Sequence, residues 1–91
     1  MVILMFKNMI RHYINIITIN DVIMFSKQEN IAISNKEANI VLNYLKNNWE
    51  SIIYGNEKDV QNFLNDNFDE NRKDQIFNLF LAYKKKYRNY L

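Results

Sequence analysis

The stretch from Tyr83 to Tyr90 interleaves cations with aromatic rings. Its cations are Lys84, Lys85, Lys86 and Arg88. Phosphate oxygens attract such cations and unstacked bases stack on such rings, so the stretch is a candidate nucleic-acid-binding surface. The structural alternative is that the cations complement the C-terminal dipole of a helix while the tyrosines complete its apolar face. We favour this alternative, because charge runs of this length are common on solvated helix ends.

Six acidic residues lie between positions 57 and 74. Carboxylates that converge in a pocket can carry out acid–base chemistry or bind a hard cation. The six residues are Glu57, Asp59, Asp66, Asp69, Glu70 and Asp74. Most lie at expected helix starts, where capping explains them. The single histidine, His12, has no nucleophile or metal-spaced partner, and no cysteine is present. The sequence therefore predicts a protein without enzymatic activity, bound metal or cofactor.

Two helix starts of the same design organise the middle of the chain. Thr18 is followed three residues later by Asp21, and Ser34 by Glu37, which is the pattern of a capping box. Between these helices, Asn30 is suited to a left-handed helix end. The alternating isoleucines that follow predict an extended connector with both of these side chains turned into the core. We predict a central helix–extended connector–helix unit.

A unit of this kind can also read DNA if its second helix carries polar side chains on its outer face. The expected helix from 34 to 49 offers Asn35, Lys36, Asn39, Asn43 and Lys46. The same residues form an ordinary solvated face in a chain rich in asparagine. We favour packing over DNA reading for this unit.

Apolar residues at helical spacing predict the remaining elements. The first stripe comprises Phe6, Met9, Ile10, Tyr13, Ile14 and Ile17, and the last comprises Ile76, Phe77, Phe80, Leu81, Tyr83 and Tyr87. A shorter helix follows Asn56, and residues 51–56 are predicted to form a tucked-in turn. With no proline and one glycine in 91 residues, sandwiches and barrels are disfavoured. The prediction is all-α, a compact bundle of four to five short helices forming a single domain over 1–91.

The cap and core positions of the central unit resemble those of the YqfT-like family of small bacterial proteins, a domain of unknown function. The resemblance lies in Ile17-Thr18, Asp21, Phe25-Ser26-Lys27-Gln28, Ile31-Ala32-Ile33-Ser34 and Glu37-Ala38. It implies a cytoplasmic helical protein and assigns no functional residue.

Long apolar and aromatic residues are numerous for so small a core, which favours a protein-interaction module, with self-association as one form of it. The candidate partner-binding residues are Tyr87, Tyr90 and Leu91 at one end of the chain, with Val2, Ile3 and Leu4 at the other. The alternative is a nucleic-acid-binding domain that uses the four basic residues of the C-terminal helix end, although the net charge is only +2. Without a signal peptide or an uncharged apolar run of spanning length, the expected location is cytoplasmic, with no membrane partner.

Overall fold

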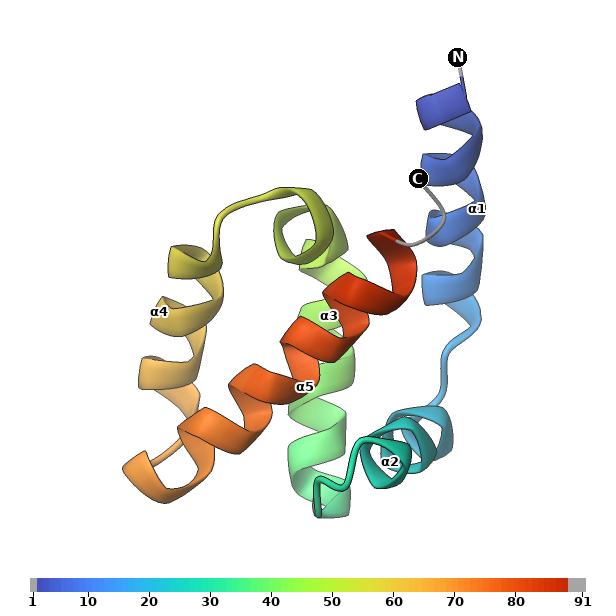
Figure 1. The fold of residues 1–91 in the computed structure, drawn as a ribbon. Coiled ribbons are helices and arrows are strands. Elements are labelled where there is room, and N and C mark those ends of the chain that lie inside the picture. The colour runs from blue at the N-terminus through green and yellow to red at the C-terminus, as the bar shows by residue number, and fades with distance from the viewer. Residues whose placement is uncertain (1, 89–91) are drawn as a thin grey trace.

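The protein is described by a computed structural model that covers residues 2–88, with side chains from residue 7 onward. These residues form five α-helices and no strand: α1 (Val2–Ile16), α2 (Ile19–Gln28), α3 (Asn35–Tyr54), α4 (Glu57–Asn67) and α5 (Glu70–Arg88). The predicted all-α bundle is confirmed. The central helix is α3, which packs against each of the other four, while α5 crosses it with α1 and α2 to one side and α4 to the other (Figure 1).

Both predicted capping boxes are present at the starts of α2 and α3. The Thr18 hydroxyl accepts a hydrogen bond from the Asp21 amide at 3.2 Å, and the Asp21 carboxylate accepts one from the Thr18 amide at 2.9 Å. Ser34 and Glu37 make the same reciprocal pair at 3.1 and 3.0 Å. Each box satisfies two backbone groups that a helix start would otherwise leave unpaired. Short-range spacing was therefore sufficient to locate both starts.

The end of α2 and the connector also follow the sequence prediction. Asn30 has a φ of 60°, the left-handed conformation that asparagine tolerates better than most residues. Around it, the Ile31 amide donates to the Ser26 carbonyl at 2.8 Å and the Asn30 amide to the Lys27 carbonyl at 3.0 Å, which together form a Schellman end. Ile31 is buried and Ile33 packs partly against the core, while the residue between them faces solvent.

Residues 51–54 of the segment predicted as a turn are instead helical, so this part of the prediction was wrong, and only Gly55 and Asn56 separate α3 from α4. The helix bends at Asn48, whose φ of −135° and ψ of 21° depart from helical values, and continues to Tyr54. The apolar period read from the sequence breaks here because the helix changes direction. The bend turns Ile52 and Ile53 into the core, so the expectation that this segment is tucked in was correct.

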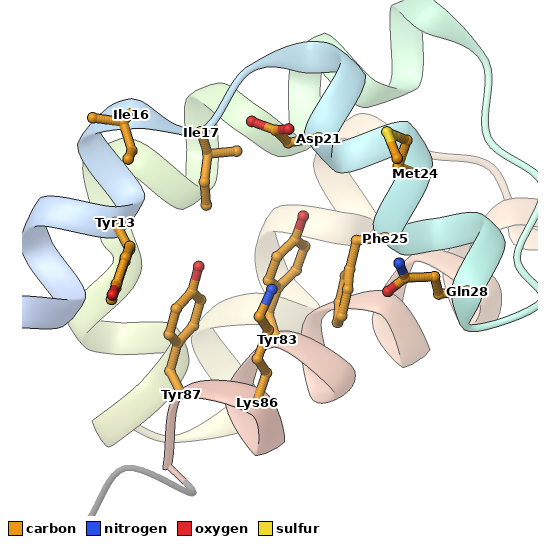
Figure 2. Close-up of a pocket in the computed structure, with 10 residues that line it drawn as sticks. All are labelled: Tyr13, Ile16, Ile17, Asp21, Met24, Phe25, Gln28, Tyr83, Lys86 and Tyr87. Atoms are coloured by element: carbon orange, nitrogen blue, oxygen red, sulfur yellow. The ribbon is translucent and has the colours of Figure 1, made fainter.

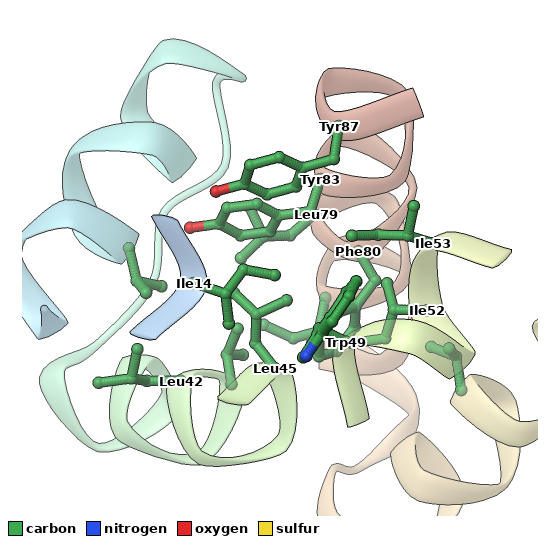
Figure 3. Packing of buried hydrophobic residues seen from close by; sticks show 14 of the residues in the cluster. Ile14, Leu42, Leu45, Trp49, Ile52, Ile53, Leu79, Phe80, Tyr83 and Tyr87 are labelled. Carbon is green, nitrogen blue, oxygen red and sulfur yellow. The ribbon is translucent and has the colours of Figure 1, made fainter. Parts of the chain in front are cut away.

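The buried cluster draws side chains from all five helices, and Figure 3 shows those of α1, α3 and α5 meeting within it. Two assignments from the sequence stripes change. Leu79 is fully buried although it lay outside the predicted stripe, whereas Tyr13, placed in the first stripe, is 43% exposed. The reason is that α5 is covered by α3, α4 and α2 on more than one face, while α1 contacts the bundle mainly through α3.

One side chain of α5 joins the connector to the first turn of α3. Arg72 donates from Nε to Glu37 Oε2 at 2.7 Å and from Nη2 to Glu37 Oε1 at 3.1 Å, and Nη2 also donates to the Ala32 carbonyl at 2.6 Å. Burial acts to raise the pKa of Glu37, but the hydrogen bonds from Arg72 and from the Ser34 amide outweigh it and hold the pKa below its ordinary value. We call Arg72, Glu37 and Ala32 the Arg72 clamp.

Replacing Arg72 by methionine is expected to lower the free energy of unfolding by about 1–2 kcal/mol, because it removes charge-assisted hydrogen bonds between partly buried groups. The matched control is Lys73→Met. Lys73 pairs with Glu70, whose side chain is 87% exposed, so this change should cost less than about 0.5 kcal/mol. Urea unfolding measures both. Equal losses in the two variants would contradict a special role for the clamp.

The lowered pKa of Glu37 also predicts a dependence of stability on pH. Because the folded pKa lies below the ordinary 4.5, the stability contributed by this carboxylate is fully present above pH 4.5 and is lost as the pH falls through the folded pKa. Glu37→Gln keeps a residue type that closes capping boxes but removes the titration. Urea midpoints from about pH 7 to about pH 3 should therefore fall less steeply for this variant than for the wild type. Parallel pH profiles would count against the assignment.

Candidate functional site

A groove of about 470 Å³ lies between the α1–α2 corner and the last turns of α5 (Figure 2). The wall formed by the α1–α2 corner carries Tyr13, Ile16, Ile17, Asp21, Met24, Phe25 and Gln28, and the wall formed by α5 carries Tyr83, Lys86 and Tyr87. Its volume is in the range of ordinary binding pockets, and its residues are mostly apolar or aromatic. We call it the α2–α5 groove.

Exposed apolar side chains converge on this groove. Among the described side chains, the large hydrophobic ones that are exposed are Tyr13 at 43%, Ile16 at 58% and Met24 at 60%, and all of them line it. Single exposed apolar residues are normal on a soluble protein and need no explanation. Their convergence around one concave surface is different, because contiguous exposed apolar surface marks interaction sites.

The floor of the groove is a cluster of aromatic rings in contact with one another. The ring centroids of Phe25 and Tyr83 lie 4.3 Å apart, and Tyr83 stacks on Tyr87 with centroids 6.3 Å apart and planes 7° apart. Burial raises the pKa of Tyr83, and the neighbouring Tyr87 and Asp21 raise it further. A phenol is already neutral at physiological pH, and the raised pKa removes Tyr83 further from proton exchange.

Two opposite charges face the groove from its two walls. Asp21 is on α2, where its carboxylate also closes the capping box, and Lys86 is on α5 (Figure 2). The Lys86 ammonium lies 4.8 Å from the ring centroid of Phe25 and 5.7 Å from that of Tyr87, distances typical of cation–π contacts. The groove thus combines an apolar floor with one acid and one base.

The structure revises one of the predicted partner-binding residues. Tyr87 was expected to be a surface anchor, but it is only 3% exposed, because its ring packs on Tyr83 between α5 and its neighbours. It contributes to the floor of the groove instead. Tyr90 and Leu91 lie outside the described residues. The same holds for the side chains of Val2, Ile3 and Leu4, whose backbone belongs to α1.

The basic residues at the end of α5 do not form one positive face. Successive residues on an α-helix are about 100° apart, so Lys84, Lys85 and Lys86 point in different directions. Lys84 Nζ lies 4.0 Å from Glu57 Oε1 of α4, and the Lys86 ammonium lies over the Phe25 ring. Lys85 and Arg88 are exposed. The four predicted nucleic-acid-binding residues therefore do not face one direction, and nucleic-acid binding itself stays a prediction.

The predicted DNA-reading face of α3 is mostly exposed, at Asn35, Lys36, Asn39 and Asn43. Lys46 differs from them, since its ammonium donates to the Asn15 carbonyl at 3.0 Å and so joins α3 to α1. One of the five predicted DNA-reading residues, Lys46, therefore stabilises the contact between α3 and α1.

The acidic residues named above as candidate cation ligands do not form a metal centre within residues 2–88. No group of three or more histidine, cysteine, aspartate and glutamate side chains is placed there to share an ion. His12 is exposed on α1 beside Tyr13, with ring centroids 6.0 Å apart. That the protein binds no metal stays a prediction. None of the helices in the described part of the chain is long and apolar enough to cross a membrane.

The sequence interpretation missed the α2–α5 groove, although one signal pointed to it. Apolar residues occupy most of the circumference of α2, at Val22, Ile23, Met24 and Phe25. A helix of ten residues packed on one side cannot bury all of them. Which of them would be exposed depended on where α5 ends, and the stripe of α2 alone could not show this.

The fold and the groove define a small helical protein with an apolar concave surface. Residues 1–83 match the family described as "Protein of unknown function (DUF2624)", and the chain belongs to that family. The prediction of a domain of unknown function is thus confirmed, while the YqfT-like name and a bacterial source stay predictions. No match was found among curated proteins or among solved structures.

Proposed function

We propose that the protein is a protein-interaction module that binds its partner in the α2–α5 groove and acts by binding rather than by catalysis. The observation that carries the proposal is the convergence of the exposed large hydrophobic side chains, Tyr13, Ile16 and Met24, on a single groove. Burying them against a partner would be favourable by roughly 25 cal/mol per Å² of apolar surface removed from water.

The groove has the composition of a binding surface. Aromatic residues and methionine are enriched in interface cores, because they supply large contact areas and, in the case of methionine, adapt to irregular partners. Here the rings of Phe25 and Tyr83 are already in contact before binding. Little side-chain conformational entropy is therefore lost when a partner binds. The preorganised aromatic floor and the flexible Met24 side chain on the rim are complementary to an apolar ligand.

The ionisable groups of the groove support binding rather than chemistry. Asp21 Oδ2 accepts a hydrogen bond from the Thr18 amide, and burial raises the pKa of Tyr83 further above physiological pH. Lys86 lies over aromatic rings. None of these groups is paired with another in the way that a general base is paired with a nucleophile.

The predicted alternative, a nucleic-acid-binding domain, gains no support from the divergent directions of Lys84, Lys85 and Lys86. The Coulomb attraction to a phosphate backbone depends on several cations facing it at once. We therefore do not adopt it as the proposed function.

Site-specific photocrosslinking tests the proposal. A photoreactive phenylalanine analogue in place of Met24 should yield a covalent protein adduct in the native host, because this side chain is 60% exposed at the rim of the groove. The matched control carries the same analogue in place of Gln61, which is exposed on α4. Denaturing gels and mass spectrometry detect the adducts. Equal adduct patterns at the two positions, or no adduct at position 24, would reject the groove as the binding surface.

A further inference from the structure

We infer that the occupant of the α2–α5 groove is a second copy of this chain, so that two protomers form a two-fold dimer through their grooves. The inference rests on the proposed function and adds the identity of the partner to it. Its basis is that the groove and its rim are complementary to themselves, both in shape and in charge.

The shape of the surface supplies both halves of a two-fold contact. In such an interface the same patch is used on both subunits, so it must contain protruding parts and the recesses that receive them. Ile16 and Met24 are more than half exposed on the wall formed by the α1–α2 corner, whereas Tyr83 and Tyr87 are nearly buried in the floor (Figure 2). A groove that receives a foreign helix needs only the recess. The protruding side chains are accounted for if each enters the groove of the other copy.

The charges of the groove show the same reciprocity. Asp21 and Lys86 face it from opposite walls. A two-fold axis that runs along the groove places the α2 wall of each protomer over the α5 wall of the other, so that each Asp21 meets the Lys86 of the partner subunit. The pairing occurs twice, and the acid and the base of the groove are both matched. A uniformly acidic or uniformly basic partner segment would leave one of these charges facing its own sign, which is unfavourable.

The size of the surface indicates a dimer that dissociates on dilution. Specific stable interfaces bury about 800 Å² on each partner. Such interfaces use roughly 20–30 residues a side, whereas ten residues line this groove. We therefore expect self-association in the micromolar range, at roughly 10⁻⁶ to 10⁻⁵ M.

Sedimentation equilibrium over protein concentrations from about 1 to about 500 μM tests the inference. The wild-type mass should rise from that of one chain, 11.1 kDa, toward twice that value. Lys86→Glu and Asp21→Lys should each weaken self-association at least tenfold, because like charges then face each other across the axis. An equimolar mixture of the two variants should regain wild-type association, because the mixed dimer carries only opposite pairs. A wild type that stays monomeric, or a mixture no tighter than either variant, overturns the inference.

The Asp21→Lys variant loses a capping box, so its fold must be checked by circular dichroism. If it is unfolded, the comparison of Met24→Glu with Gln61→Glu replaces the mixture. Both positions are exposed on helices, but only the first is at the groove. We expect at least tenfold weaker association for Met24→Glu and unchanged association for Gln61→Glu. Equal effects of the two changes overturn the inference.

The two proposals can fail separately. If the photoreactive analogue at position 24 captures another protein while the purified chain remains monomeric, the inference fails and the proposed function stands. If it captures nothing beyond the control, the proposed function fails. An adduct with the mass of two chains, formed by the purified protein itself, supports both.

Discussion

The carboxylate of Glu37 closes the capping box of α3 and at the same time accepts two hydrogen bonds from Arg72 of α5. The same guanidinium holds the Ala32 carbonyl of the connector. The start of the central helix, the connector and the start of α5 are therefore fixed to one another at one point. With its first turn held there and its buried face packed along α3, α5 extends until its last turns reach α2. The aromatic floor of the groove forms where Tyr83 meets Phe25.

Features that depend on residues a few positions apart could be predicted from the sequence. The capping boxes, the left-handed Asn30 and the buried face of α3 are of this kind, because caps and helical stripes follow local spacing. The Arg72 clamp joins residues 35 positions apart, and nothing in the local pattern singles out Arg72 from other basic residues. The bend at Asn48 was read as the end of a helix because a change of direction and an ending interrupt the apolar period in the same way.

The groove could not be derived from the sequence for a related reason. Tyr13 has the spacing of a core residue, yet α1 contacts the bundle chiefly through α3 and leaves this ring at its edge. Tyr87 lies in the basic C-terminal stretch and was expected at the surface, yet it is buried and stacks on Tyr83. Exposure at these positions is decided by how the helices cross, and crossing depends on contacts between distant parts of the chain. The sequence shows that α2 has more apolar residues than one face can bury, but it does not show which of them line the groove.

The central claim is that Met24 and its surroundings form the contact surface for a second protomer. It is tested most directly by following the methyl NMR signal of Met24 over a dilution series, with Met9, half-buried on α1, as the internal reference. The account predicts that the Met24 signal shifts with protein concentration, because the aromatic floor of the partner's groove would surround it, while the Met9 signal stays constant. A Met24 signal that does not change with concentration, or a shift at Met9 instead, would contradict it.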